Sequence, residues 1–262
     1  MKILVLPGDG IGPEIMAATM TAVEALAERF NLELEFETRE IGLAAHAKTG
    51  ATLSDDTIAE IHQAHGVILG PASTFDYPAK EDGGINPSST IRKGLDLYAN
   101  IRPSRVRIGV PAMAGAMDLV IVRENTEGFY ADRNMFAGSG EFMPTEDVAL
   151  AVRKITAHGS QRIARSAFEL ASTRRKRVVA VHKGNVLKLS EGLFLDQVRA
   201  VAAEYPDVEL DEILIDAMAA HLVRRPGDFD VIVTTNMYGD ILSDQAAELS
   251  GGLGLGGSIN AG

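Results

Sequence analysis

The stretch Asn236–Asp244 reads NMYGDILSD and stands between two kinds of pattern. It follows the apolar run Val231–Val233, which is typical of a buried strand, and it leads into the helical pattern Ile241–Leu249. Asp240 and Asp244 are four residues apart, so on a helix their side chains lie on one face. Two carboxylates held this close repel each other unless a cation lies between them, and oxygen ligands suit Mg²⁺ or Mn²⁺. The spacing alone leaves a second interpretation open, a solvated helix face without a metal.

Strand-like and helix-like segments alternate along the rest of the chain. The apolar runs that predict strands are Lys2–Leu6, Leu32–Phe36, Gly66–Gly70, Leu119–Val122, Val178–Val181 and Val231–Val233. Helical periodicity covers Pro13–Arg29, a segment from a Ser54 N-cap to Gln63, and Leu193–Ala203. Residues 131–144 show neither period and are expected to form an arm. The alternation predicts an α/β fold with a largely parallel sheet.

The composition is typical of a globular protein. The chain has 262 residues, 46% of them apolar, and it contains no cysteine, which excludes disulfides and thiolate metal sites. Its apolar runs are shorter than the roughly 18 residues that a membrane span needs. The N-terminus is interpreted as a first strand and not as a secretory signal. We therefore expect a cytoplasmic protein with no membrane partner, and the net charge of −11 argues against a nucleic-acid partner.

A glycine-rich turn, GDGIGPE at residues 8–14, lies between the first predicted strand and the first predicted helix. Backbone amides at such a turn can approach a ligand, and the N-terminus of the following helix favours anions. The spacing differs from the dinucleotide-binding fingerprint, and Pro13 removes one amide at the start of the helix. From the residues alone, a plain tight turn is the better interpretation.

Three arginines are candidates for binding a substrate that carries more than one carboxylate: Arg92, Arg102 and Arg123. Each could equally be an ordinary surface arginine. Arg123 directly follows an apolar strand, however, and ligands of α/β sheets bind at strand ends. Planar guanidinium groups recognise carboxylates through two hydrogen bonds, which suits a di- or tricarboxylic acid.

Other polar residues also follow predicted strands. Lys183 and Asn185 come after Val178–Val181, and Asp216 ends another short apolar run. Lys183 could act as a base only if burial or a nearby cation lowered its pKa, so a solvated lysine is the alternative. Tyr130 follows the Arg123 segment and offers a phenolic proton.

Taken together, five segments resemble the isocitrate/isopropylmalate dehydrogenase family, the metal-dependent β-decarboxylating dehydrogenases of 3-substituted malates. They occur in the family's order and span nearly the whole chain. The segments are GDGIGPE at 8–14, LDLYANIRP at 95–103, VRENTEG at 122–128, HKGN at 182–185 and NMYGDILSD at 236–244. The resemblance implies an α/β/α sandwich of two domains that differs from a classical Rossmann fold.

The resemblance also implies a role for each matching residue. Arg92, Arg102 and Arg123 would hold the substrate carboxylates. Asp240 and Asp244, with Asp216 of the partner subunit, would bind Mg²⁺ or Mn²⁺. In the catalytic set Tyr130, Lys183 and Asp216, the partner's Lys183 would take the hydroxyl proton and Tyr130 would return a proton to the enolate. Shared sites of this kind imply a homodimer.

The cofactor implied by the family is NAD, with NADP not excluded. Its expected contacts in this chain are Ile11, Ala72, Asn185 and Asn260. Family members continue beyond residue 262 through a loop that grips the adenosine half of the cofactor. We therefore expect residues 1–99 with 252–262 to form a cofactor-side domain whose C-terminal part is missing, and residues 100–251 to form a smaller substrate and dimerisation domain.

Substrate choice in this family is set just before the first arginine, where relatives that oxidise isopropylmalate have leucines. This chain has Ser88 and Ser89 there, within NPSSTI at residues 86–91. A polar wall suits a γ-carboxylate or hydroxyl better than an isopropyl group. Isocitrate and homoisocitrate are favoured, while 3-isopropylmalate stays open, as do tartrate or malate and a catalytically silent, truncated dimeric binding protein. The competing interpretation of residues 86–90 is an exposed helix start capped by Ser89.

Overall fold

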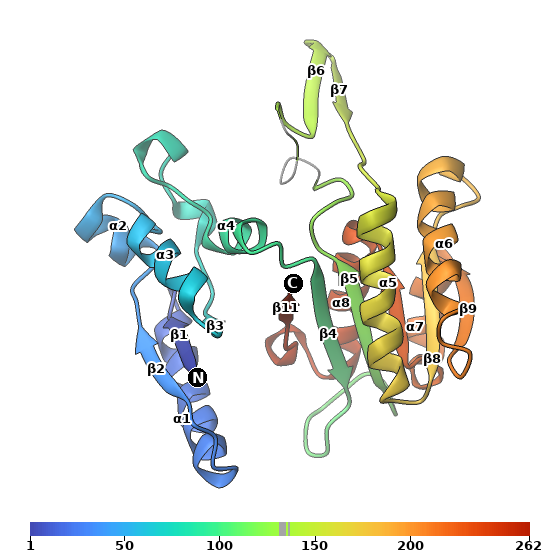
Figure 1. Cartoon of the computed structure of the whole chain (residues 1–262), viewed down its shortest axis with the longest axis horizontal. Helices are drawn as coiled ribbons and strands as arrows, with labels where there is room; N and C mark the ends of the chain where they lie inside the picture. Colours follow the sequence, from blue (N-terminus) through green and yellow to red (C-terminus); the bar gives the residue numbers. More distant parts are fainter. Residues whose placement is uncertain (131–134, 136) are drawn as a thin grey trace. The chain divides into compact units, whose positions relative to one another are not determined.

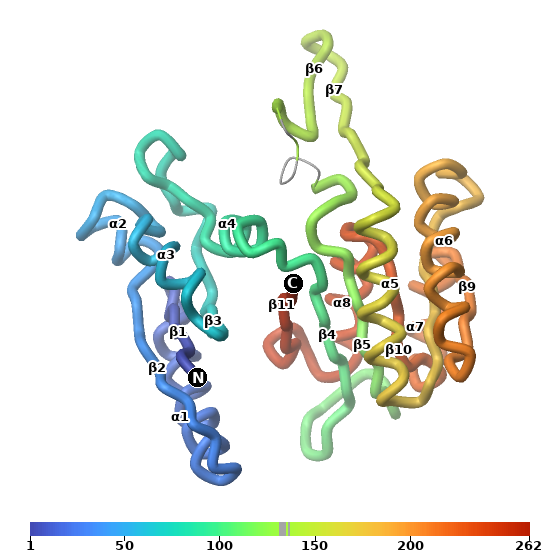
Figure 2. Tube along the Cα trace, in the orientation of Figure 1, coloured from blue at the N-terminus to red at the C-terminus, as the bar shows by residue number. Residues whose placement is uncertain are grey.

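A computed structural model describes residues 1–130, 135 and 137–262. The chain packs as two compact units, Met1–Leu95 and Asp96–Gly262, each with its own sheet. Figures 1 and 2 trace the chain through both units, from blue at the N-terminus to red at the C-terminus. The expected mixed α/β class is confirmed.

The first unit is built on a small parallel sheet with the strand order β2-β1-β3. Its strands are β1 (Lys2–Leu6), β2 (Glu35–Thr38) and β3 (Gly66–Leu69). Its helices are α1 (Gly12–Arg29), α2 (Leu43–Thr49), α3 (Asp55–Gln63) and α4 (Pro87–Gly94), with short turns η1 (Thr74–Asp76) and η2 (Lys80–Asp82). Leu4, Val5 and Leu6 of the central strand are buried, as the apolar run predicts.

Local sequence signals account for several of these boundaries. Ser54 caps α3 as predicted, because its hydroxyl accepts a hydrogen bond of 3.2 Å from the amide of Thr57. The second strand begins at Glu35, later than expected. Residues 31 and 32 belong to the turn that ends α1 and not to the strand. The amide of Leu32 donates to the carbonyl of Ala27, and Asn31 takes a left-handed conformation with φ of 51°.

The second unit is built on a large sheet with the order β11-β4-β5-β10-β8-β9. Strands β5, β10, β8 and β9 run parallel, and β4 is antiparallel to both of its neighbours, β5 and β11. The prediction of a largely parallel sheet is confirmed. The strands are β4 (Ala99–Arg105), β5 (Asp118–Glu124), β8 (Arg177–His182), β9 (Glu209–Leu214), β10 (Val231–Thr234) and β11 (Ile259–Ala261). The helices are α5 (Ala157–Ser172), α6 (Lys188–Ala202), α7 (Ile215–Arg224) and α8 (Asn236–Ser250), with turns η4 (Pro226–Asp228) and η5 (Leu253–Leu255).

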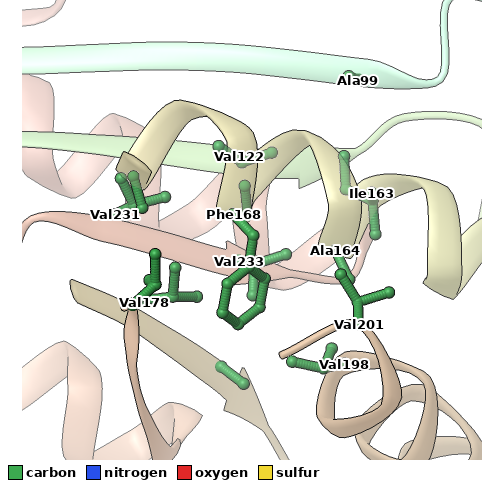
Figure 3. Close-up of a cluster of buried hydrophobic side chains, with 14 of the residues drawn as sticks. Ala99, Val122, Ile163, Ala164, Phe168, Val178, Val198, Val201, Val231 and Val233 are labelled. Carbon is green, nitrogen blue, oxygen red and sulfur yellow. The ribbon is translucent and has the colours of Figure 1, made fainter. Parts of the chain in front are cut away.

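Both faces of this sheet are covered by helices. Along β5, Val120 and Val122 point into a cluster with α5 and α6, while Leu119 and Ile121 point into a cluster with α7 and α8. This alternation follows from the two-residue period of a strand. Figure 3 shows the first cluster, where Phe168 lies among the valines of the sheet. The result is a helix–sheet–helix sandwich that fixes the ends of the strands rigidly.

A hairpin of β6 (Glu141–Thr145) and β7 (Val148–Ala151) extends from the second unit (Figure 1). All of its strand residues are exposed, including Phe142 and Leu150. The hairpin overlaps the arm predicted at residues 131–144 only at residues 141–144, and β7 lies beyond that prediction. Part of that arm, residues 131–134 and 136, lies outside the described residues.

The last strand, β11, is hydrogen-bonded to β4 within the second unit. Residues 252–262, which the sequence analysis assigns to the cofactor-side domain, therefore pack in this structure with Asp96–Gly262. The domain boundaries of the family assignment stay a prediction. In the described part of the chain, no helix combines the length and apolar character needed to cross a membrane.

Candidate active site at the carboxyl edge of the large sheet

The predicted residues of the second unit gather where the parallel strands of the large sheet end. Thr234 of β10 is level with Arg123 of β5 on one side and with Val181 of β8 on the other. His182 of β8 is level with Leu214 of β9. The residues that follow these strands therefore lie along one edge of the sheet, which we call the carboxyl edge. Ligands of α/β sheets bind at this kind of edge.

Arg123 is held inside this edge with only 2% of its surface exposed. Its Nε and Nη2 donate to Oδ1 of Asn236 at 2.8 and 2.6 Å, and its Nη1 donates to Asp240. The helix that bears these partners can come this close because residue 239 is glycine: a Cβ there would lie 2.6 Å from the Cβ of Arg123. The sequence analysis did not identify Asn236 as a site residue, although it begins the NMYGDILSD segment.

Arg102, on the neighbouring strand β4, reaches the same helix. Its Nη1 donates to Oγ of Ser243 at 2.8 Å and to Oδ1 of Asp244 at 3.0 Å, and its Nη2 lies 3.6 Å from Asp240. Its Nε donates to Oδ1 of Asn100 at 2.7 Å. The structure therefore brings two of the three predicted substrate arginines to the two carboxylates of α8.

One of these two carboxylates, Asp240, also contacts the predicted proton donor. Tyr130 donates its hydroxyl to Oδ2 of Asp240 at 2.9 Å, and its ring lies 5.5 Å from the guanidinium carbon of Arg123. Asp240 and Asp244 lie one helical turn apart, and the side chain of Asp244 is 60% exposed. Carboxylate oxygens so placed fit a hard divalent cation. Among the described residues of one chain, no group of three histidine or acidic side chains could hold a metal ion.

Lys183 and Asp216 form a pair further along the edge. Lys183 follows β8 and Asp216 lies in the first turn of α7, and Nζ of the lysine is 2.5 Å from Oδ1 of the aspartate. The hydrogen bond from the ammonium group lowers the pKa of Asp216 below its ordinary value. Three-quarters of the lysine side chain is buried whereas most of the aspartate is exposed. The candidate base Lys183 and the candidate metal ligand Asp216 are therefore hydrogen-bonded to each other.

The remaining predicted substrate residues lie in the first unit, on α4. Ser88 and Ser89 are four and three residues before Arg92, so the three side chains share one face of the helix. All three are half-buried. The cap of this helix is Asn86, whose Oδ1 accepts from the amide of Ser89 at 3.0 Å. The competing interpretation of Ser89 as the N-cap is therefore wrong, although the helix does start here.

The two predicted cofactor residues of the first unit lie on adjacent loops. Ile11 is in the glycine-rich turn and Ala72 follows β3. The amide of Asp9 donates to the carbonyl of Pro71 at 2.8 Å, which joins the two loops. A Cβ at Gly8, where φ is 78°, would lie 2.0 Å from that carbonyl oxygen, so the tight turn requires glycine.

Asp9 supports the loops that carry the predicted cofactor residues, and the sequence analysis did not identify this role. It is buried, and its carboxylate accepts from the amides of Leu43 at 2.7 Å and Ser73 at 3.2 Å and from the hydroxyl of Tyr77 at 2.5 Å. Burial together with this hydrogen bond raises the pKa of Tyr77. Asp9 therefore locks three loops at one end of the small sheet. Its position inside GDGIGPE was the available signal.

The other two predicted cofactor residues lie in the second unit and differ in environment. Asn185 is exposed just after β8. Asn260, on β11, uses its Oδ1 to accept from Nδ2 of Asn100 at 2.9 Å and from Nδ2 of Asn125 at 3.1 Å. Asn260 is thus connected through Asn100 to the substrate arginine Arg102.

Comparison with known proteins identifies the family of the chain. The family model described as isocitrate/isopropylmalate dehydrogenase matches residues 2–262. The chain is 41% identical to a 3-isopropylmalate dehydrogenase of Methanothermobacter thermautotrophicus and 42% identical to an isocitrate/homoisocitrate dehydrogenase of Thermus thermophilus. In both cases 100% of this chain covers 74% of the relative.

Among solved structures, an isocitrate dehydrogenase from Methylococcus capsulatus matches with a TM-score of 0.86 and 41% identity. The match covers 100% of this chain and 74% of that one. The sequence resemblance is thereby confirmed over the whole chain. The chain belongs to the isocitrate/isopropylmalate dehydrogenase family, the decarboxylating dehydrogenases that act on a CH–OH group.

Proposed function

We propose that the protein oxidises and decarboxylates a 3-substituted malate, with NAD as the hydride acceptor and Mg²⁺ or Mn²⁺ as the metal. NADP is the alternative acceptor. The observation that carries the proposal is the meeting of Arg102 and Arg123 with Asp240 and Asp244 at the carboxyl edge. Cationic groups for an anionic acid and carboxylates for a cation lie within hydrogen-bond distance of each other there.

The charges of this site support a reaction that needs both a metal cation and an anionic acid. Asp240 and Asp244 would hold the metal with Asp216 of the partner subunit, and the bound metal would act as a Lewis acid for oxidation and for the enolate left by CO₂ loss. Once the aspartates face a cation, Arg102 and Arg123 can turn their charge to the substrate carboxylates. Arg92, on α4, would supply a third contact. Tyr130 already donates its hydroxyl into this group, which suits a proton donor to the enolate.

We propose that Lys183 and Asp216 serve the site of a second subunit in a homodimer. Within one chain they bond to each other, and described residues of one chain offer no complete metal site. Exposed apolar side chains lie beside them, with Val186 64% and Leu189 90% exposed. The exposed β6–β7 hairpin adds apolar surface and unpaired strand edges that a second copy could cover.

Substrate choice is proposed to depend on Ser88 and Ser89. They lie on the face of α4 that carries Arg92, and their hydroxyls can hydrogen-bond a γ-carboxylate or hydroxyl. Isocitrate or homoisocitrate is therefore our first choice and 3-isopropylmalate the second. The names of the relatives include all three acids. Tartrate or malate would need the same carboxylate contacts and no γ-pocket.

We propose that Ile11 and Ala72 contact NAD; the hydrogen bond between Asp9 and Pro71 joins their two loops. For Asn185 and Asn260, the family resemblance alone implies a contact with NAD. The joined loops are supporting evidence because they form a fixed backbone surface next to the N-terminus of α1. The cytoplasmic location stays a prediction.

Steady-state assays of the 262-residue chain test this proposal. We expect Mn²⁺-dependent reduction of NAD, with release of one CO₂ per hydride, in the presence of isocitrate or homoisocitrate, and slower reaction with 3-isopropylmalate. Failure to reduce NAD or NADP with any of these acids, by protein that still binds Mn²⁺ and acid in calorimetry, would favour the silent binding protein over the enzyme.

A further inference from the structure

We infer that Asn100 and Asn236 are positioning residues for the two substrate arginines of the carboxyl edge. Each supplies a buried, uncharged oxygen that fixes one guanidinium group from behind and leaves its positive charge for an anionic ligand. The inference rests on the proposed function, because it assigns Arg102 and Arg123 to the substrate.

Asn236 fixes the plane of Arg123. Its Oδ1 accepts from both Nε and Nη2, which are the two donors on one edge of the guanidinium, so the group cannot rotate about its long axis. The amide itself is fully buried, and its Nδ2 donates to the carbonyl of Glu127 at 3.1 Å. This bond determines which end of the amide faces Arg123. Nη1 is thereby directed to Asp240 in the site.

Asn100 does the same for Arg102 with a different anchor. Its Oδ1 accepts from Nε of Arg102, and its Nδ2 donates to Oγ of Ser258 at 2.8 Å and to Oδ1 of Asn260. Asn100 is fully buried and lies opposite Arg123 in the β4–β5 register. The two arginines are therefore oriented by asparagines on adjoining elements of one sheet edge.

The chemistry of these acceptors differs from that around other held arginines of the second unit. Arg153 bonds to the buried carboxylate of Glu191, Arg162 to Asp96, and Arg174 to Asp118 and Asp230. A carboxylate behind an arginine cancels its charge, whereas an amide oxygen orients it without doing so.

The carboxylates that Arg102 and Arg123 do reach, Asp240 and Asp244, are the proposed metal ligands, whose charge a cation would balance. Behind the two arginines a neutral acceptor is therefore required, since a permanent counter-charge would compete with the substrate.

The discriminating experiment compares Asn100→Asp with Asn100→Ala. Aspartate keeps the acceptor for Arg102, and its neighbours can adapt: the Ser258 hydroxyl can rotate, and the Asn260 amide can flip. A flipped Asn260 gives up the hydrogen bond from Nδ2 of Asn125, which keeps its bond to the carbonyl of Leu97. We therefore expect Asn100→Asp to melt closer to the wild type than Asn100→Ala does.

Binding affinities should rank in the opposite order. Isocitrate, homoisocitrate and 3-isopropylmalate are each titrated calorimetrically in the presence of Mn²⁺, and Mn²⁺ is titrated alone. We expect the acid that binds the wild type to bind about 30-fold more weakly to Asn100→Asp but only about 5-fold more weakly to Asn100→Ala, with no loss of Mn²⁺ affinity in Asn100→Asp. Asn31→Asp, which adds the same charge at an exposed turn, is the control and should stay within about 2-fold.

A purely structural role predicts that acid affinity follows the melting temperature, with Asn100→Asp binding better than Asn100→Ala. That result overturns the inference, as does wild-type affinity in both variants. Wild-type protein that binds none of the three acids overturns the proposed function and the inference with it. If Asn100→Asp does not fold, Asn236→Ala decides: weaker acid binding with unchanged Mn²⁺ affinity supports the inference, and unchanged acid binding overturns it.

Discussion

The two ends of the parallel strands in the large sheet both carry charged groups, but they use them differently. At the amino edge, Asp230 precedes β10 and is fully buried; it accepts from Nε of Arg174 at 2.8 Å and from the amide of Arg175 at 2.9 Å. At the carboxyl edge, Arg123 is equally buried, yet its fixed partner is the neutral Asn236, and its charged partner Asp240 is one-third exposed.

This difference separates charged groups that stabilise the fold from charged groups proposed to bind ligands. At the amino edge, opposite charges are paired within the fold, and neither Arg174 nor Asp230 is in a position to take a new partner without loss. Under the proposed function, the exposed Asp244 and the amide-backed arginines at the carboxyl edge exchange partners when a cation and an anion bind. We therefore call the amino edge the structural end of the sheet and the carboxyl edge its proposed functional end.

The largest effect is expected for Asp240→Asn at the carboxyl edge. The amide keeps the shape but removes one charge from a hard-cation site, so Mn²⁺ binding should weaken and turnover should fall by more than about 100-fold. Arg123 keeps its bonds to Asn236, so the melting temperature should change little. Mn²⁺ affinity equal to that of the wild type would contradict the assignment of Asp240 as a ligand.

The Ser88→Leu/Ser89→Leu double variant tests the proposed role of α4, in the first unit, in substrate choice. Burying methylenes against an isopropyl group is worth about 1–3 kcal/mol, so the ratio of kcat/KM for 3-isopropylmalate over isocitrate should rise roughly 10- to 200-fold. Asn86, which caps the helix, is untouched and provides a matched control as Asn86→Asp, which conserves the capping oxygen. If the ratio does not change in the double variant, the γ-substituent is bound elsewhere.

At the structural end, the same change from aspartate to asparagine should lower stability and leave activity unchanged. Asp230→Asn removes a buried charge from Arg174 and Arg175, and the free energy of unfolding should fall by about 2–3 kcal/mol. At temperatures where the variant stays folded, kcat and KM should equal those of the wild type. A loss of kcat without a loss of stability would remove the distinction between the two edges.

The smallest effect on stability is expected for the Lys183–Asp216 pair. Because its folded pKa is lowered by Lys183, Asp216 contributes stability above its unfolded pKa and loses it as the pH falls through the folded pKa. In Lys183→Ala the pKa of Asp216 should rise towards its ordinary value, as measured by carboxyl-carbon NMR. The stability change at neutral pH should be small because Asp216 is mostly exposed. An unaltered pKa would show that the pair is not formed in solution.

Sequence patterns predicted the strands that carry the site better than the elements around them. Val231–Val233 and Leu119–Val122 are uniformly apolar because strands buried on both faces need no polar residues, and their ends were placed within a few residues. Strands β6 and β7 gave no such signal, since every residue in them is exposed. Helix α4 is short and starts with a proline, so its period was not visible in PSSTIRKG.

At the candidate site, the sequence indicated the charged residues but not the asparagines that orient the arginines. Asp240 and Asp244 stand out by their four-residue spacing in a helical pattern, and Lys183 by its position after an apolar strand. Asn100 and Asn236 look like ordinary loop or cap residues in a sequence. Their role depends on full burial beside an arginine distant in the chain, which only the β4–β5 and β10–β5 pairings create.

Complementation between two inactive chains tests most directly whether the functional end is completed by a second subunit. Lys183→Ala and Asp240→Asn chains are unfolded together and refolded as a mixture. In a heterodimer one site would collect both lesions and the other neither, so we predict about half the activity of a wild-type dimer per heterodimer, from two inactive parents. Heterodimers shown to form and found inactive would contradict the account, because Lys183 and Asp240 would then act within one chain or not together at all.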